Sequence, residues 1–189
     1  MAKRVTPEAV IKVLNVAGIR PVLMGTYGLV GWRGEPRATL GVDVLVHKRD
    51  VRKAVHSLRK AFPKLIVTDT AVVTRFEDPA IGKVVIDVMK PTQPVYKLIF
   101  RHTVSAGRTH DIPDLEMSLI SKFAAMTSLN RAPERKMQDA VDFVEIVKHN
   151  REEIDLKKLH RLADKVYPNG SEEIIALFSD IDAGRTIRV

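Results

Sequence analysis

The sequence predicts an α+β fold, in which a mixed β-sheet is flanked by helices and followed by a C-terminal helical subdomain. Up to about residue 90, short β-branched segments alternate with amphipathic helical patterns. Two of these β-rich segments carry an Asp at their centre, Asp43 and Asp87. Beyond about residue 113 only helical periodicity remains. We therefore expect an α/β core over residues 1–112 and a helical subdomain over residues 113–189.

Capping signals and periodicity place each element of the α/β core. Thr6 followed by Pro7 predicts the start of a helix that ends near Gly18. Residues 50–62 have apolar and basic side chains on opposite faces, which is typical of an amphipathic helix. The segments with β-rich composition, which we expect to be strands of one mixed sheet, are 21–25, 38–47, 65–70, 71–76 and 83–89.

Helices are expected in the rest of the chain, after two short elements. Residues 95–100 fit either a short helix or a connector, and residues 109–114 fit a short strand and turn. Asp114 is a typical capping residue for the apolar helical pattern that follows it, and residues 130–133 interrupt that pattern. Further helices are predicted over 137–148 and after Asp155 and Ser171.

Charge is unevenly distributed along the chain, whose formal net charge is +8. Through His110 there are 19 Lys and Arg against 8 Asp and Glu, so the basic character belongs to the strand-rich part. This imbalance suits an anionic ligand such as a nucleotide or a nucleic acid backbone, although a solvated basic surface explains it equally well. The absence of Cys excludes disulfides and thiolate metal sites. No segment is apolar enough to span a membrane, and we expect a cytoplasmic protein.

The two Asp residues within apolar strands indicate a functional site. A buried strand normally excludes an unpaired carboxylate, so Asp43 and Asp87 need a cation or a cluster of donors beside them. Carboxylates on neighbouring strands can hold Mg²⁺, and the glycine turn at Gly25 would let backbone N–H groups approach a phosphate chain. The alternative is that each Asp forms a buried salt bridge with Arg37 or Lys90.

These residues resemble the nucleotidyltransferase superfamily, and in particular the AbiEii toxin-like nucleotidyltransferases of bacteria. That group has a helix, a strand that ends in a glycine turn, an Arg-x-Thr-x-Asp-hydrophobic-Asp strand, a later strand with a third Asp, and a helical tail. The matching positions in the core are Gly25-Thr26, Arg37-Ala-Thr39, Asp43 and Asp87. In the tail they are Glu116, Lys122, Gln138, Asp139 and Asp142, so the resemblance covers about residues 8–150.

The resemblance implies a nucleotidyltransferase-like fold and a transferase that uses Mg²⁺. Asp43 and Asp87 would be the catalytic residues and the metal ligands. The residues that it implies for nucleotide binding are Gly25, Thr26, Arg37, Thr39 and Lys122. The protein would bind NTP and transfer a nucleoside monophosphate to a hydroxyl of RNA or protein. A further alternative is that the chain is itself a structural or toxin–antitoxin-type partner protein whose helical tail contacts another protein. No membrane partner is expected.

One position departs from the family pattern. Gly41 stands where active members have the first Asp of the acidic pair, and that residue is thought to ligate both metal ions. A carboxylate from elsewhere could substitute, with Glu35, Asp69 and Glu77 as candidates. Otherwise the chain is a catalytically degenerate module that binds nucleotide or nucleic acid.

Several tail and turn residues also have a purely structural interpretation. Lys122 lies on a mostly apolar helix face and could extend its charge to solvent. Asp139 and Asp142 could be solvated or paired with Arg135. Tyr27 and Trp32 could stack on a base, but hydrophobic cover over the glycine turn is the favoured interpretation. The six His residues show no metal-binding spacing.

Overall fold

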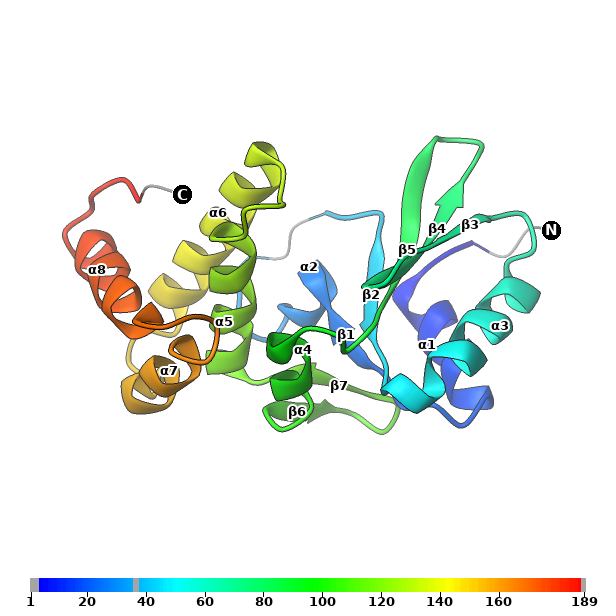
Figure 1. Cartoon of the computed structure of the whole chain (residues 1–189), viewed down its shortest axis with the longest axis horizontal. Coiled ribbons are helices and arrows are strands. Elements are labelled where there is room, and N and C mark those ends of the chain that lie inside the picture. Colours follow the sequence, from blue (N-terminus) through cyan, green and yellow to red (C-terminus); the bar gives the residue numbers. More distant parts are fainter. Residues whose placement is uncertain (1–3, 36–37, 188–189) are drawn as a thin grey trace. The chain divides into compact units, whose positions relative to one another are not determined.

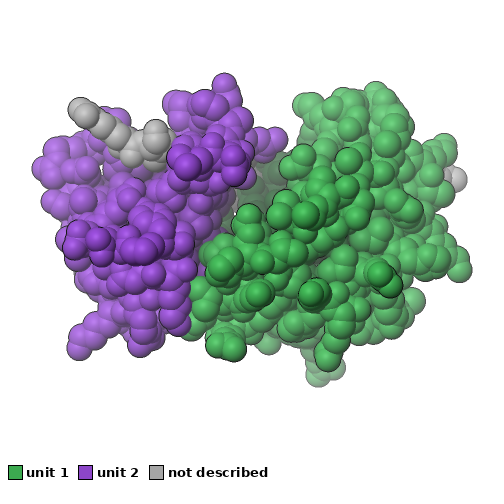
Figure 2. Space-filling view, in the orientation of Figure 1, with its two compact units in different colours: residues 1–29, 37–113 green, residues 30–36, 114–189 purple. Residues whose placement is uncertain are grey.

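The computed structural model describes residues 4–35 and 38–187, and the chain divides into two compact units. The first unit contains the described residues up to 29 together with residues 38–113, and the second contains residues 30–35 and 114–187 (Figures 1 and 2). The chain therefore leaves the first unit after residue 29, contributes the short segment 30–35 to the second unit, and is again part of the first unit from residue 38. No helix in the described part of the chain is long and apolar enough to cross a membrane.

A mixed sheet organises the first unit, as the sequence predicts, and it has seven strands. The strand order is β3-β4-β5-β2-β1-β7-β6, and the pairs β2–β5 and β1–β7 are parallel whereas the others are antiparallel. The strands are β1 (Val22–Met24), β2 (Val42–Leu45), β3 (Ile66–Asp69), β4 (Val73–Asp78), β5 (Lys83–Met89), β6 (Thr103–Ala106) and β7 (His110–Pro113). The helices of this unit are α1 (Pro7–Val16), α2 (Gly25–Gly28), α3 (Val51–Ala61) and α4 (Pro94–Ile99), with a 3₁₀ turn at Lys48–Asp50.

The hydrophobic core of this unit lies between one face of the sheet and the helices α1 and α3. Val42 and Val44 of β2 and Val88 of β5 are at most 1% exposed and belong to the same cluster as the buried residues of both helices. Since side chains alternate along a strand, Asp43 and Asp87 must project from the opposite face. Burial of the apolar positions therefore determines which face carries the two carboxylates.

The two expected elements on either side of segment 30–35 differ from the structure. The strand predicted over 38–47 is confined to Val42–Leu45, because residues 38–41 have no ladder partner among the described residues. The predicted glycine turn is a single helical turn, α2, which begins at Gly25.

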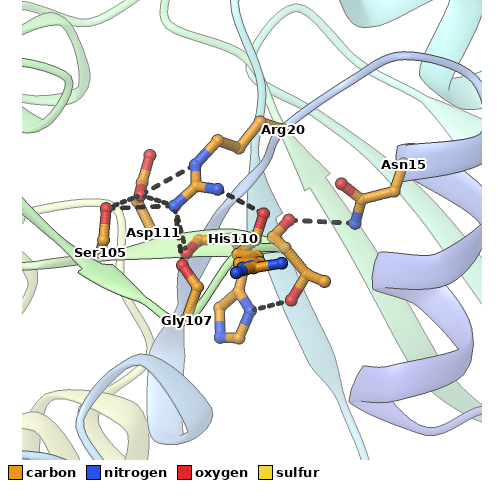
Figure 3. Close-up of polar contacts among 8 residues, drawn as sticks. Asn15, Arg20, Ser105, Gly107, His110 and Asp111 are labelled. Atoms are coloured by element: carbon orange, nitrogen blue, oxygen red, sulfur yellow. Dashed lines mark hydrogen bonds and ion pairs between the residues drawn. The ribbon is translucent and has the colours of Figure 1, made fainter.

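The hairpin of β6 and β7 includes a strand that the sequence does not reveal. β6 is an edge strand in which Val104 is flanked by polar residues and is itself 39% exposed, so no apolar alternation marks it. Arg20 holds the hairpin, because its guanidinium binds Asp111 Oδ1 at 2.5 Å and donates to the carbonyl oxygens of Arg108 and His110 (Figure 3). The hydrogen bond from Arg20 holds the pKa of Asp111 below its usual value.

Four helices form most of the second unit: α5 (Leu115–Met126), α6 (Pro133–His149), α7 (Leu156–Ala163) and α8 (Gly170–Asp182). Asp114 and Asp155 cap α5 and α7 by accepting hydrogen bonds from the backbone N–H groups of Met117 and Lys158, both at 3.0 Å. α6 begins earlier than the sequence predicts, because Pro133 occupies its first turn instead of ending the interruption before it.

Segment 30–35 packs onto this helical unit. Arg33 Nη1 lies 2.5 Å from Asp142 Oδ1 of α6. Asn150 Nδ2 donates to the carbonyl oxygen of Trp32 at 2.6 Å, and Gly34 lies against the ring of His149. Segment 30–35 is thus attached to the helical unit through the side chain of Arg33 and the backbone carbonyl of Trp32.

Candidate active site

The two predicted acids are direct neighbours in the sheet. Asp43 of β2 and Asp87 of β5 are register partners in a parallel pair, so both side chains project from the same face. Neighbouring strands are about 5 Å apart, which brings the two carboxylates into range of one cation. Both residues are half-buried, so the pair is accessible from the face that α1 and α3 leave uncovered.

Gly25 lies directly against the carboxylate of Asp43. Met24 is the register partner of Asp43 across the β1–β2 ladder, and Gly25 follows it with φ +59°. A Cβ atom on Gly25 would lie 1.9 Å from Asp43 Oδ2, where no side chain fits. Glycine is required here both by its left-handed backbone and by the space that Asp43 occupies. The first residue of α2 is therefore bare backbone beside a carboxylate.

A basic residue that the sequence analysis did not single out lies beside Asp87. Arg75 of β4 is the register partner of Asp87, and its Nε atom lies 3.7 Å from Asp87 Oδ1. The Arg75 side chain is 54% exposed, so its guanidinium remains open to solvent. Of the two cations considered for the acids, Lys90 binds Asp69 instead, at 2.8 Å, and Arg37 lies outside the described residues. Arg75, Asp87 and Asp43 thus form a row across three strands.

A β-bulge brings Arg75 into this row. Glu77 pairs with Val84, but Phe76 pairs with Ile86, so Val85 is an extra residue on β5. Counting back from the β4–β5 turn without the bulge would place Arg75 opposite Ile86, on the core face. Because only the three-dimensional ladder reveals the extra residue, strand patterns alone could not have identified Arg75 as a neighbour of Asp87.

The position of Gly41 has space for a side chain. Among the described residues, the atom nearest to a Cβ built on Gly41 is the carbonyl oxygen of Val84, at 3.8 Å, which is ordinary van der Waals contact. Its φ angle also lies outside the left-handed region. Glycine is therefore not required at Gly41 by packing or by backbone conformation, in contrast to Gly25.

No third acid joins the pair in the part of the chain that the structure describes. The described His, Asp and Glu residues contain no group of three that could hold a metal ion. Asp69 pairs with Thr74, and Thr74 in turn pairs with Val88, whose side chain faces the core. Asp69 therefore lies on the core face of the sheet, where it binds Lys90. Glu77 pairs with Val84 beyond the bulge, and Glu35 is an exposed residue of the segment grouped with the helical unit.

The residues around α2 connect the glycine turn to the start of β2. Tyr27 packs against the hydrophobic core, and its hydroxyl donates to the carbonyl oxygen of Thr39 at 3.3 Å. Thr26 is half-buried between Gly25 and Tyr27. The packing of Tyr27 agrees with the interpretation that it forms hydrophobic cover over the glycine turn. Trp32, in contrast, belongs to segment 30–35 of the helical unit, where Asn150 binds its carbonyl oxygen.

Lys122 lies in the helical unit, within a network of buried charges. Its Nζ atom donates to Asp139 Oδ1 at 2.9 Å and to Asp142 Oδ2 at 2.6 Å. Arg131 binds the other oxygen of Asp139, and Arg33 binds the other oxygen of Asp142, both at 2.5 Å. Lys122 is 9% exposed and the two Asp residues are at most 3% exposed, so the interpretations that placed these charges in solvent are wrong.

Glu116, which matches the same family helix, anchors the start of α7. Its Oε2 atom binds Lys158 Nζ at 2.7 Å, and its Oε1 atom accepts the N–H of Asp155 at 3.0 Å. Lys158 also binds Asp114, the cap of α5, at 2.8 Å. Glu116 thus joins the first turns of two helices.

Comparisons with known proteins agree on the fold. No protein-family model matches the sequence, and no curated protein matches it. Among solved structures, an antigenic nucleotidyltransferase-like protein from Paracoccidioides brasiliensis is 18% identical, with a TM-score of 0.54 over 94% of this chain and 91% of that one. JHP933 from Helicobacter pylori is 17% identical, with a TM-score of 0.53 over 93% of this chain and 87% of that one.

The antibiotic-resistance factor ANT(2'')-Ia is also similar, at 10% identity and a TM-score of 0.54, over 94% of this chain and 93% of that one. These similarities extend over both units, since each covers more than nine-tenths of the chain. Together with the mixed sheet and the helices after it, they show that this chain has the α+β fold of nucleotidyltransferase-like proteins.

Proposed function

We propose that this chain binds a nucleoside triphosphate at Gly25-Thr26 and the Asp43–Asp87 pair, and transfers a nucleoside monophosphate to a hydroxyl of RNA or protein. The observation that carries the proposal is the register of β1, β2 and β5, which places both carboxylates on one face and Asp43 against Gly25. Bare backbone beside a carboxylate pair is suited to a phosphate chain that is bridged by a cation.

The residues present fit one Mg²⁺ ion. Mg²⁺ in nucleotide sites is commonly bound by one or two carboxylates together with substrate phosphates, and Asp43 and Asp87 would supply those carboxylates. When bound, Mg²⁺ would neutralise the charge that develops on the phosphates during transfer. The donor set is minimal, because the described residues provide no third acid at the pair.

The remaining residues would bind and orient the nucleotide. Thr26 can donate its hydroxyl, and Thr39 is kept beside the glycine turn by Tyr27. The exposed guanidinium of Arg75 supplies a fixed positive charge next to Asp87. The phosphate contact predicted for Arg37 rests on the family resemblance alone. The nucleotide contact predicted for Lys122 also rests on the resemblance, and its Nζ atom is bound by Asp139 and Asp142.

A catalytically degenerate binding module of the same fold is the second candidate function. It is favoured by Gly41, which takes the place of an acid in the resembling family, and by the salt bridge of Asp87 with Arg75. Such a module would hold nucleotide or nucleic acid without transfer. The alternative that the chain is a toxin–antitoxin-type partner protein, and the closer relationship to the AbiEii-like group, rest on the sequence resemblance.

Asp43→Asn is expected to reduce transfer by about 100-fold or more, because it removes a charged oxygen ligand from the cation without changing the side-chain size. Radiolabelled NTP would be incubated with Mg²⁺ and either bulk RNA or cell protein, and incorporation into each acceptor would be counted. Asp50→Asn, an acid outside the row, is the matched control and should leave incorporation unchanged. If the wild-type chain shows no incorporation with Mg²⁺ or Mn²⁺ but binds NTP, the binding module replaces the enzyme.

Gly41→Asp is expected to raise Mg²⁺ affinity by about tenfold, because a third carboxylate would join the pair at a position with space for it. Stability without metal should fall by only about 1 kcal/mol, through repulsion among like charges. Calorimetric titration with Mg²⁺ measures the gain. Leu40→Asp is the control, since it adds the same charge one residue away at an exposed position. Equal affinities for the two variants would mean that position 41 does not face the acids.

A further inference from the structure

A hollow of the first unit lies between α3 and the strand ends at Thr74 and Lys90. It has a volume of about 520 Å³. We call it the basic groove and define it by its charged and titratable lining residues, which are Lys48, Arg52, His56, Arg59, Asp69 and Lys90. Val51 and Val55 provide an apolar part of the lining. The groove therefore combines an apolar surface with several cationic side chains.

The cations of the groove are regularly spaced along one helix. Arg52, His56 and Arg59 are separated by four and three residues, which places them in one stripe of α3. At 1.5 Å per residue, Arg52 and Arg59 are about 10 Å apart along the helix axis. Lys48 continues the stripe into the 3₁₀ turn before α3. The result is a line of positive charge rather than a single point.

Most of this charge is uncompensated. Asp69 is the only carboxylate among the described residues that line the groove, and it already binds Lys90 and Thr74. The hydrogen bonds from Lys90 and Thr74 and, to a smaller extent, the charge of Arg59 hold the pKa of Asp69 below its usual value, and Lys90 is the cation that pairs with Asp69 directly. Within the described residues, Lys48, Arg52 and Arg59 form no ion pair with a carboxylate. Three cations are therefore available to an anionic ligand.

The basic groove is on the other face of the sheet from the acid pair. Thr74 is the register partner of Val88, whose side chain belongs to the core under α3, whereas Arg75 and Asp87 project from the opposite face. A ligand in the groove would thus leave the Asp43–Asp87 pair unobstructed.

We propose that the basic groove binds the phosphodiester backbone of single-stranded RNA. A concave, positively charged surface with regularly spaced cations is typical of sites that follow a single strand, whereas duplex grooves are entered by protruding elements. His56 is the one aromatic ring in the lining, so binding should depend little on sequence. This inference rests on the proposed function: the groove would hold the RNA whose hydroxyl accepts the nucleoside monophosphate.

The test compares two double variants of one helix. Arg52→Glu with Arg59→Glu reverses two groove cations, and Lys53→Glu with Lys60→Glu reverses two exposed cations of α3 that lie outside the groove lining. Both pairs are seven residues apart and change the net charge by the same amount. Binding of a fluorescently labelled 12-nucleotide RNA of mixed sequence would be followed by anisotropy, without NTP or Mg²⁺. We expect the groove variant to bind at least tenfold more weakly and the control less than threefold more weakly.

Salt dependence provides an independent measurement. Each phosphate that is neutralised on a single strand contributes about 0.7 to the slope of log K against log salt. Loss of two such contacts should flatten the slope by about 1.4 for the groove variant relative to the wild type. The control variant should keep the wild-type slope. Circular dichroism and thermal unfolding of both variants verify that each remains folded.

Several results would overturn the proposal that the groove binds single-stranded RNA. These are an equal loss of RNA affinity in the two double variants, no RNA binding by the wild type at low salt, tighter binding of duplex RNA than of single-stranded RNA, or binding of single-stranded DNA that is at least tenfold tighter than that of single-stranded RNA. Asp43→Asn should bind the RNA as the wild type does, because Asp43 lies on the other face. RNA binding that depends on the groove in a protein without transfer activity would refute the proposed transfer and leave the groove intact. Transfer to RNA that is unaffected by Arg52→Glu with Arg59→Glu would refute the groove alone.

Discussion

Lys122→Met is expected to lower the free energy of unfolding by about 3–5 kcal/mol, the largest effect of any single substitution considered for this chain. The replacement removes the cation that binds both Asp139 and Asp142, whose side chains are at most 4% exposed. Arg131 and Arg33 each remain bound to one of the acids, but two carboxylate oxygens lose their partner in a buried environment. Urea denaturation at pH 7, followed by circular dichroism, measures the change.

The control for this prediction is Lys148→Met, which truncates an exposed Lys of α6 and should change stability by no more than about 0.5 kcal/mol. Adding Asp139→Asn and Asp142→Asn to Lys122→Met should restore part of the loss, because neutral side chains tolerate burial better than unpaired charges. A wild-type unfolding curve for Lys122→Met with a weakened NTP affinity would contradict a structural role. It would support the nucleotide contact that the family resemblance implies.

Gly25→Ala is expected to destabilise the chain by about 1–3 kcal/mol and to abolish Mg²⁺ and NTP binding together. The methyl group would need a left-handed backbone at φ +59° and would lie 1.9 Å from Asp43 Oδ2, so the carboxylate has to leave its place beside Asp87. Thermal unfolding gives the stability, and titration with Mg²⁺ and with NTP gives the two affinities.

Gly82→Ala separates the two causes. Gly82 has φ +60°, but no atom of the described residues lies within 4 Å of a Cβ built on it, so its substitution introduces the backbone strain alone. It should reduce stability by a comparable amount and leave ligand binding unchanged. If Gly25→Ala behaves like Gly82→Ala in every measurement, Asp43 is not a ligand of the cation or nucleotide.

Much of the fold could be predicted from local signals. The caps at Thr6, Asp114 and Asp155 each accept a backbone hydrogen bond at the start of a helix, because side-chain capping depends on neighbours in sequence only. β5 has the predicted bounds, because its β-branched composition is a signal carried by the strand's own residues. β6 could not be predicted because an exposed edge strand needs little apolar surface, and Pro133 was ambiguous because proline both ends and begins helices.

The candidate site was predictable to a smaller extent. Two Asp residues within apolar strands indicated the pair, and the structure places them side by side. The neighbours of Lys122 could not be inferred, because helical periodicity identifies a buried face but not which charges from another helix meet there. Segment 30–35 gave no signal, since its attachment depends on Arg33 and Asn150, which bind partners more than 100 residues away.

The extra residue in β5 makes the charge of the candidate site depend on the register of the β4–β5 hairpin. Arg75 faces Asp87 only because Val85 is left out of the β4–β5 ladder. If the hairpin slipped by one residue so that Val85 entered the ladder, Arg75 would pair with Ile86 and turn towards the apolar core face, with neither Arg75 nor Asp87 altered. Deletion of Val85 would instead remove the bulge and keep Arg75 opposite Asp87. The acid pair could therefore lose its neighbouring cation through a change of strand register alone. Alignments that compare residue identities at Arg75 would not detect such a change.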